Sequence, residues 1–483
     1  MNRNLVFRLP PLALALALAA CTTVGPDYRV PATAAVNAPK AAQRFEQADA
    51  HADIASQAAL PDHWWRLYDD ATLDRLIEQA LARNTDLRQA VANLERVQAI
   101  EDETAGARRP TVSASGGPSF GHASGLSVLQ PGYEPPDSYH YSANASLSYQ
   151  VDPFGQIRRA MQAAVAGTGA AWAALDLVRV NVAAGTAQAY ADVCAAGLQL
   201  RTAQHSLEVQ RDALNVTRRL QQAGRAGELD VSRAQAQLSQ LDAMLPPLKA
   251  QRQAALYRLA TLTGDLPRDV PADAAACAQP PKLMATIPVG DGAALLRRRP
   301  DIRQAERELA QATARIGVAT ADLYPKVSLG LSAGSIGPAS DIGRADTFSW
   351  SLGPLISWTL PNTGAAQARI AQAEASTRAA AAKFDGTVLT ALRETETALS
   401  AYAQDLDRRT ALQAARQASA TAAEQARLLY RNGKTGYLES LDAERGLASS
   451  DAALAAAQAQ LASDQIAVFR ALGGGWEAAN PSQ

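Results

Sequence analysis

The residue types that could do chemistry in this chain of 483 residues occur without the spacings that catalysis or metal binding requires. The five histidines show no metal-ligand spacing, and no Gly-x-Ser-x-Gly nucleophile motif is present. Gly433-Lys434-Thr435 has the ending of a phosphate-binding P-loop, but Leu428 stands where that motif needs its first glycine. We therefore predict that the protein is not an enzyme and that it holds no metal ion or soluble cofactor.

Charge and composition exclude one further class of partner and indicate the architecture. The chain carries 46 Lys and Arg against 47 Asp and Glu, a net charge of -1. Nucleic acid is therefore not expected as a partner, because neutralising phosphates needs a basic surplus. Aromatic residues make up only 5% of a chain that is rich in alanine and glutamine. This composition favours long, thinly packed helices over a bulky core.

The N-terminus reads as a lipoprotein signal peptide over residues 1–20. Two arginines precede an uncharged run of about a dozen residues, which is too short to span a bilayer. The run ends in Leu18-Ala19-Ala20-Cys21, which resembles the bacterial lipobox, so we expect Cys21 to carry a covalent lipid that includes palmitate. An ordinary signal peptide with a coincidental cysteine is the alternative. Sequence spacing does not decide whether Cys194 and Cys277 are free or paired.

Strict alternation over residues 139–151 predicts a strand with one apolar face and one uncharged polar face. No segment after the N-terminus has 18 uninterrupted apolar residues, so we expect no transmembrane helix. A chain without such a helix can span a bilayer only as a closed β-barrel. Thirteen strand residues reach about 43 Å, enough for the apolar band of about 25 Å in such barrels. A soluble β-sandwich would show the same alternation.

The chain also repeats itself. Residues 86–90 match 301–305, and Gly224-x-x-Gly227 matches Gly433-x-x-Gly436 in the same order, which predicts a tandem duplication. The fold class is then mixed α+β, with four strands per protomer. Four strands cannot close a pore, so a dimer with eight or a trimer with twelve is required. Each half should contain a helix (70–108; 293–322), two strands (110–122 and 138–151; 326–335 and 347–360) and two long helical stretches (156–222 and 228–263; 365–431 and 437–472).

Pro246-Pro247 should kink or break the helical stretch in which it lies. The predicted domains are a signal peptide (1–20), a lipid-anchored N-terminal extension (21–68), first-repeat helices (69–109), strands 1 and 2 (110–151), a first long helical hairpin (152–264), a Pro/Ala-rich equatorial connection (265–292), a second-repeat helix (293–324), strands 3 and 4 (325–361), a second long helical hairpin (362–473) and a C-terminal tail (474–483).

Six stretches of the chain resemble the outer-membrane factor family (TolC- and OprM-like channels), in its lipoprotein branch. The family implies a homotrimer with a twelve-stranded outer-membrane barrel that continues as a helical tunnel into the periplasm. It also implies a periplasmic adaptor and an inner-membrane pump of the resistance-nodulation-division type as partners, and passive export of drugs or other small toxic compounds. The stretches are CTTVGPDY (21–28), WWRLYDDATLDRLIEQALARNTDL (64–87), VDPFGQIRRA (151–160), LLRRRPDIRQAERELAQATARIGVATADLYPKVSL (295–329), GYLESLDAERGL (436–447) and ALGGGW (471–476).

By that resemblance, a periplasmic gate lies just after the second Gly-x-x-Gly. Leu438 would form an apolar constriction and Asp442 an acidic ring that favours cations; they are four residues apart and share a helix face. Glu439 would join the ring, and Tyr430 would hold the closed state by hydrogen bonding. The hairpin tips would meet the adaptor through Gly224, Arg225, Gly227, Gly433, Lys434 and Gly436.

Alternative interpretations remain for each of these residues and for the whole chain. The two acids are alternatively solvated helix-face residues, and the tips are alternatively plain turns. An exit duct for a type I protein secretion system would have the same architecture as an efflux duct. A lipid-anchored periplasmic coiled-coil scaffold without a pore is the alternative outside transport.

Overall fold

The computed structural model describes residues 23–50, 55–122, 124, 131–283, 286–358 and 363–476. Cys21, the predicted signal peptide and the end of the predicted C-terminal tail lie outside the described residues. The chain forms two compact units, and each is described by itself. The first comprises the described parts of 1–31, 94–171 and 305–383, and the second those of 32–93, 172–304 and 384–483.

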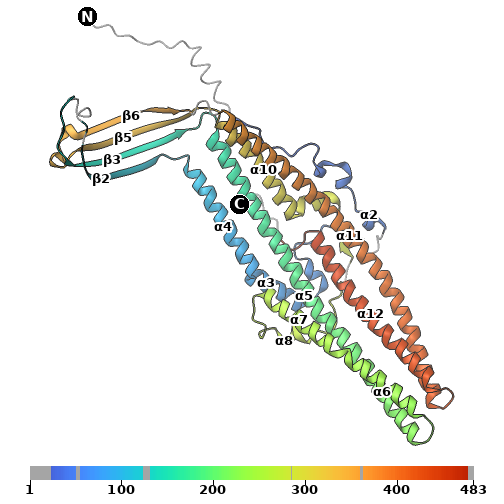
Figure 1. The fold of residues 1–483 in the computed structure, drawn as a ribbon. Helices are drawn as coiled ribbons and strands as arrows, with labels where there is room; N and C mark the ends of the chain where they lie inside the picture. The colour runs from blue at the N-terminus through green and yellow to red at the C-terminus, as the bar shows by residue number, and fades with distance from the viewer. Residues whose placement is uncertain are drawn as a thin grey trace. The chain divides into compact units, whose positions relative to one another are not determined.

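The first unit contains an antiparallel sheet, and its strands fall where the alternation predicts them. Among the described residues the sheet has four strands in the order β2-β3-β5-β6 (Figure 1). Because neighbours are paired only within this order, β2 and β6 are its two edges. The strands are β2 (Thr111–Gly121), β3 (Ser138–Val151), β5 (Lys326–Pro338) and β6 (Phe348–Ser357).

The strand register separates apolar from polar side chains. Residues directly opposite one another in neighbouring strands point to the same face, and two adjacent rows run across the whole sheet. The Oγ atoms of Ser113 and Ser146 are 2.7 Å apart, and those of Ser332 and Ser351 are 2.8 Å apart. The apolar row is Val112, Leu147, Leu331 and Leu352, and the hydroxyl row is Ser113, Ser146, Ser332 and Ser351.

Both faces of this sheet are largely uncovered. Trp350 is 67% exposed and Val112 is 71% exposed on the apolar face. The opposite face is mostly serine, glycine and asparagine, with Ile336 and Leu355 as its large apolar exceptions. The sheet therefore has an unpartnered apolar surface on one side and a polar surface on the other, which is uncharged apart from Lys326 at the start of β5.

Four helices contribute residues to both units, and two of them are very long. Helix α5 has 67 residues and α11 has 69. By length and composition alone, α5 is long and apolar enough to cross a membrane, which differs from the expectation of no such helix. Of its most apolar window, 44% is buried within the protein. The four helices are α4 (Thr85–Gly106), α5 (Gln156–Gln222), α10 (Pro300–Ala321) and α11 (Thr363–Arg431).

The two shorter predicted helices are each divided in two, which corrects the sequence prediction. The range 70–108 breaks at Asn84, whose side-chain oxygen caps α4 by accepting from the backbone N–H of Asp86 at 2.8 Å. The range 293–322 breaks at Arg299, which precedes Pro300, and the residue before proline disfavours helix. The prolines at 246 and 247 also divide the predicted stretch 228–263, as expected.

The second unit contains the best-packed core. Trp64, Trp65 and Phe469 are almost wholly buried, and the rings of Trp64 and Phe469 stack at 4.5 Å between centroids. Its further elements are α2 (Glu46–Ala50), β1 (Ala55–Ser56), α3 (Ala71–Arg83), α6 (Glu228–Ala243), α7 (Leu245–Thr263), α8 (Ala272–Ala276), β4 (Ile287–Pro288), α9 (Gly292–Arg298), α12 (Tyr437–Ala471) and the 3₁₀ turns η1 (Ala35–Asn37), η2 (Pro39–Ala42) and η3 (Trp64–Tyr68). Two more such turns, η5 (Ala339–Asp341) and η6 (Ala345–Thr347), belong to the first unit.

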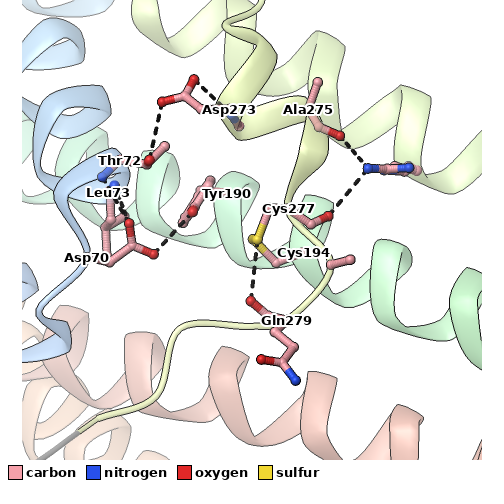
Figure 2. The surroundings of a disulfide bond; sticks show 12 residues. Asp70, Thr72, Leu73, Tyr190, Cys194, Asp273, Ala275, Cys277 and Gln279 are labelled. Atoms are coloured by element: carbon pink, nitrogen blue, oxygen red, sulfur yellow. Dashed lines mark hydrogen bonds between the residues drawn. A yellow bond between two sulfur atoms is a disulfide. The ribbon is translucent and has the colours of Figure 1, made fainter.

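A disulfide joins Cys194 of α5 to Cys277, which follows α8 (Figure 2). This bond answers the question that the sequence left open. Asp273, in α8, accepts hydrogen bonds from Arg75 at 2.5 Å and from Thr72 at 3.2 Å. The segment 265–283 is thus fastened both to α5 and to α3. Disulfides persist in oxidising compartments such as the bacterial periplasm.

Candidate functional site

Two helical hairpin tips carry the predicted site, and both are closed by the same turn. Gly224 and Gly433 have φ angles of +72° and +68°, the left-handed region that favours glycine. The N–H of Arg225 donates to the carbonyl of Leu220 at 2.7 Å, and the N–H of Lys434 donates to that of Leu429 at 2.9 Å. These are the six-residue bonds of a Schellman cap, so each glycine ends its long helix.

The two tips lie next to each other within the second unit. A Cβ atom added to Gly433 would lie 3.1 Å from a guanidinium nitrogen of Arg225. The structure therefore brings together residues 208 positions apart. Arg225 and Lys434 are both exposed, which makes this end of the unit basic.

The predicted gate residues of α12 occupy its exposed face. Leu438 is 55% exposed, and Glu439 and Asp442 are exposed as well. On the other face, Tyr437 and Leu441 are buried in a cluster with Leu214 of α5 and Ala234 of α6. One side of α12 thus fastens it to the first hairpin, and the other side is uncovered in the protomer.

Tyr430 does not lie with the exposed acids. Its hydroxyl donates to Oγ1 of Thr217 at 3.5 Å, and its ring centroid is 5.5 Å from that of Tyr437. It therefore connects α11 to α5 across the seam between the hairpins. Tyr437 was missed by the sequence reasoning, although it stands four residues before Leu441 and could have been found from that helical spacing. Burial raises the pKa of Tyr437, so it remains a neutral phenol.

The two tips differ in charge where their sequences correspond. In the first, Asp230 forms an ion pair of 3.8 Å with Arg233, one turn later in α6. The corresponding residues 209 positions later are Glu439 and Asp442, both acids. The carboxylate of the first tip has a cation beside it on the same helix face, whereas the second tip presents two carboxylates on one face. This face of the second tip is therefore more negative than the corresponding face of the first tip.

Ion pairs fasten the second hairpin internally. Nε of Arg427 lies 2.7 Å from the Glu444 carboxylate, and Nε of Arg416 lies 2.7 Å from that of Asp451. Both pairs join α11 to α12. Burial raises the pKa of Glu444 although Arg427 opposes the shift. These residues were also missed, because no sequence spacing predicts which residues of two long helices meet.

In the described part of the chain, no group of three or more histidine, cysteine, aspartate or glutamate side chains could hold a metal ion. The geometry of the tips offers turns, a basic end and a pair of acids. It can therefore bind a partner or control the passage of ions.

Comparison with known proteins identifies the family. The family described as outer membrane efflux protein matches residues 76–265 and 293–474, which include both hairpins and the whole sheet. The chain belongs to the outer membrane efflux protein family.

Relatives within this family match the chain nearly end to end. Nodulation protein T of Rhizobium leguminosarum bv. viciae is 30% identical over 98% of this chain and 94% of its own. The probable efflux pump outer membrane protein TtgC of Pseudomonas putida is 31% identical over 96% and 94%. The solved structure of the outer-membrane channel OprN has 38% identity, a TM-score of 0.87, and covers 94% of this chain and 100% of that one. OprN and the MtrE protein of Neisseria gonorrhoeae, which is 28% identical with a TM-score of 0.80 over 94% of this chain and 98% of that one, are both described as outer-membrane channels.

Proposed function

We propose that this protein is the outer-membrane exit duct of a tripartite efflux system driven by an inner-membrane pump of the resistance-nodulation-division type. It passively passes drugs or other small toxic compounds to the exterior. The observation that carries the proposal is the sheet, which has one bare apolar face, one polar face and two open edges. Relatives described as efflux pump outer membrane proteins support the efflux role.

The dimensions and aromatic residues of the sheet support its placement in a membrane as part of a barrel. Phe120 and Tyr139 pack together at one end of the apolar face, with ring centroids 4.9 Å apart. Tyr149 and Trp358 lie toward the other end, 37% and 54% exposed. Ten strand residues separate Tyr139 from Tyr149, about 33 Å along the strand or about 25 Å when tilted. That length matches the apolar band between two aromatic girdles.

Closure of the barrel requires further copies of the chain. The edges β2 and β6 have unpaired backbone groups, which a bilayer does not tolerate. Three copies would supply twelve strands, as in the outer-membrane factors that the sequence resembles. The order α4-β2-β3-α5 recurs as α10-β5-β6-α11, which supports the proposed internal duplication and the division into two strand pairs and two long hairpins.

The N-terminus adds the proposed anchor. Cys21 would carry the covalent lipid, and residues 21–68 would run from the membrane to the equatorial part of the protein. The disulfide at Cys194 supports a location outside the cytoplasm. The proposed site is then the ring of Leu438, Glu439 and Asp442 at the periplasmic end, with Tyr430 holding the seam beside it.

Conductance through planar bilayers tests both the pore and the gate. Purified protein should form channels and migrate as a heat-modifiable trimer. Leu438→Ala combined with Asp442→Ala should raise the resting conductance several-fold, because it removes an apolar constriction and an acidic ring. The matched control is Leu229→Ala with Arg233→Ala at the first tip, which should leave conductance unchanged. A detergent-extracted monomer without conductance would overturn the proposal, and equal effects of the two double variants would remove the gate.

Crosslinking at the tips tests the proposed partner. Photo-reactive residues in place of Arg225 and Lys434 should capture a periplasmic adaptor in cells that also express the pump. Capture of the adaptor of a type I secretion ATPase would instead assign the duct to protein secretion. A probe at Arg268, exposed and remote in sequence from both tips, serves as the control.

A further inference from the structure

The first unit contains a hollow of about 720 Å³ that the efflux role does not use. Its walls come from residues 26–28 near the N-terminus, from Arg108 just after α4, from the first turns of α5 and from the middle of α10. Segments from four separate parts of the chain therefore converge on one space.

Arginines dominate the charge of this hollow. Four guanidinium groups line it, from Arg108, Arg158, Arg159 and Arg307, and Asp27 is the one acid among the described lining residues. Arg159 has a side chain only 3% exposed, and its nitrogens donate to Asp27 and to backbone carbonyls. Arg307 is paired with Glu306 at 2.6 Å. The lining thus has a surplus of positive charge.

Two of these arginines are available to a ligand. Arg108 is exposed and forms no ion pair within the described residues. Arg158 is exposed as well, and its side chain donates one hydrogen bond, from Nη1 to Oγ1 of Thr23, while its backbone N–H donates to Asp152. A guanidinium has five N–H donors in a planar fork that matches phosphate. Both arginines therefore have donors left for an anion in the hollow.

The N-terminal wall is built to a close fit. Gly25 has φ of +84°, and a Cβ atom there would lie 2.4 Å from Cα of Gly317 in α10. A Cβ atom on Gly317 would in turn lie 2.6 Å from Cγ of Arg159. Two glycines therefore let the N-terminal segment lie directly against α10. The hydroxyl of Tyr28 fixes the other end of this wall by donating to Glu306 at 3.2 Å.

The hollow lies close to the helical ends of the strands. Arg108 is three residues before β2, and Arg158 is seven residues after β3. Phe154, between β3 and α5, stacks on Tyr324 at 4.6 Å, as aromatic residues do at membrane interfaces. If the sheet crosses the bilayer as proposed above, then Arg108 and Arg158 lie at the level of the lipid headgroups.

We propose that this hollow binds the phosphate group of a glycerophospholipid from the adjacent membrane leaflet. Arg108 and Arg158 hold the phosphate, while Arg159 and Arg307 supply positive charge behind it. The space is far larger than a phosphate ion, and Met161, Ala166, Ala310 and Ala314 give it an apolar lining. Val165, 52% exposed beside it, continues this apolar surface outward. Such a lining suits the glycerol and the first acyl carbons of a lipid.

Native mass spectrometry of the delipidated full-length protein in neutral detergent tests this site. Phosphatidylglycerol should bind with one tight site per protomer, and diacylglycerol with the same chains should not. Arg108→Gln combined with Arg158→Gln should weaken phosphatidylglycerol binding about tenfold or more, since it removes charge-assisted hydrogen bonds. Arg211→Gln combined with Arg268→Gln, two exposed arginines of the second unit, is the matched control and should bind as the wild type does.

Three results would overturn the proposal. They are undiminished lipid binding by the Arg108/Arg158 variant, equal losses in the control variant, and binding of inorganic phosphate or glycerol 3-phosphate as tight as that of the lipid. The last would assign the hollow to a free anion. Because the proposal rests on the membrane role of the sheet, conductance is measured on the same variants. Normal conductance with undiminished lipid binding in the variant would reject only the proposed lipid site. Absence of conductance in the wild type would instead reject the proposed exit-duct function.

Discussion

The two long hairpins follow one plan but are held in different ways. In the first, α5 packs with two helices separated at Met244, and an ion pair of 2.7 Å joins Asp192 of α5 to Arg258 of α7. A disulfide also fastens α5 to the connection after α8. In the second, α11 packs with α12, which runs unbroken for 35 residues. Ion pairs such as Arg427 with Glu444 hold its helices together.

This difference indicates that the two hairpins are not equally free to move. A covalent cross-link cannot exchange partners, whereas ion pairs and hydrogen bonds can. The second hairpin also has the two uncompensated acids, Glu439 and Asp442, where the first has the ion pair of Asp230 with Arg233. If the protein opens as a duct as proposed, we predict that the first hairpin stays fixed as a frame and that the second hairpin moves.

The largest expected effect is loss of the frame's cross-link. Cys194→Ala combined with Cys277→Ala should lower the free energy of unfolding by about 4 kcal/mol, because the bond closes a loop with a sequence separation of 83. Denaturant titration with and without reductant measures this. Reductant should destabilise the wild type and leave the double variant unchanged; a wild type indifferent to reductant would contradict the role of the bond.

The next largest effect is a difference in stability loss between the buried and exposed faces of α12. Leu441→Ala should cost about 3 kcal/mol, since Leu441 is 2% exposed in the seam between the hairpins. Leu438→Ala, three residues earlier on the exposed face, should change stability by less than about 0.5 kcal/mol. Thermal denaturation of both variants measures the contrast. Similar losses would mean that Leu438 is also packed in the native assembly.

A further expected effect concerns pH and a carboxyl group of the second hairpin. Burial raises the pKa of Asp464 in α12 to about 6, and the nearby Asp405 of α11 adds to the shift. The folded state therefore binds a proton more tightly than the unfolded state, and this stability is lost as pH rises from about 4 through 6. Asp464→Asn should reduce the loss of stability with rising pH and should stabilise the protein at pH 7 by about 1 kcal/mol.

Melting temperatures between pH 4 and 7 measure this effect. Asp407→Asn, at an exposed position two residues after Asp405, should keep the wild-type pH profile. An Asp464→Asn profile that parallels the wild type would show that the carboxyl pair does not titrate in this range.

The smallest effect compares the two tips directly. Gly224→Ala and Gly433→Ala should each cost about 1 kcal/mol, because an L side chain is strained at positive φ. The cost at Gly433 should be slightly greater, since its Cβ would meet the guanidinium of Arg225. Gly446→Ala, inside α12 with open space around it, should instead stabilise by up to about 1 kcal/mol. Denaturant midpoints measure all three, and a neutral Gly433→Ala would question the turn.

Much of the fold could be predicted because it follows local periodicity. Alternation located the strands to within a few residues, and the prolines at 246 and 247 located the break between α6 and α7. The parallel pair of β1 and β4 could not be predicted, because it joins Ala55 to Ile287 through two residues each. The pairing of Cys194 with Cys277 likewise depends on how distant segments fold back.

The candidate site was predictable to the same extent. The spacing of Leu438 and Asp442 places them on one helix face, and both side chains are exposed in the protomer. The residues of the seam could not be predicted from the sequence, because Tyr430 contacts Thr217 and Tyr437 only when the two hairpins align. Whether the exposed acids form a ring stays a prediction for the assembled protein.

The unpaired borders of the sheet have a consequence for biogenesis. A solitary copy would expose backbone N–H and C=O groups of β2 and β6 to hydrocarbon, at a cost of several kcal/mol for each unmet group. Insertion into the bilayer and association with sister copies should therefore be one concerted event. In cells that produce intact and damaged copies together, a single defective border strand would leave the shared wall open, so such damage would be dominant over the intact gene product.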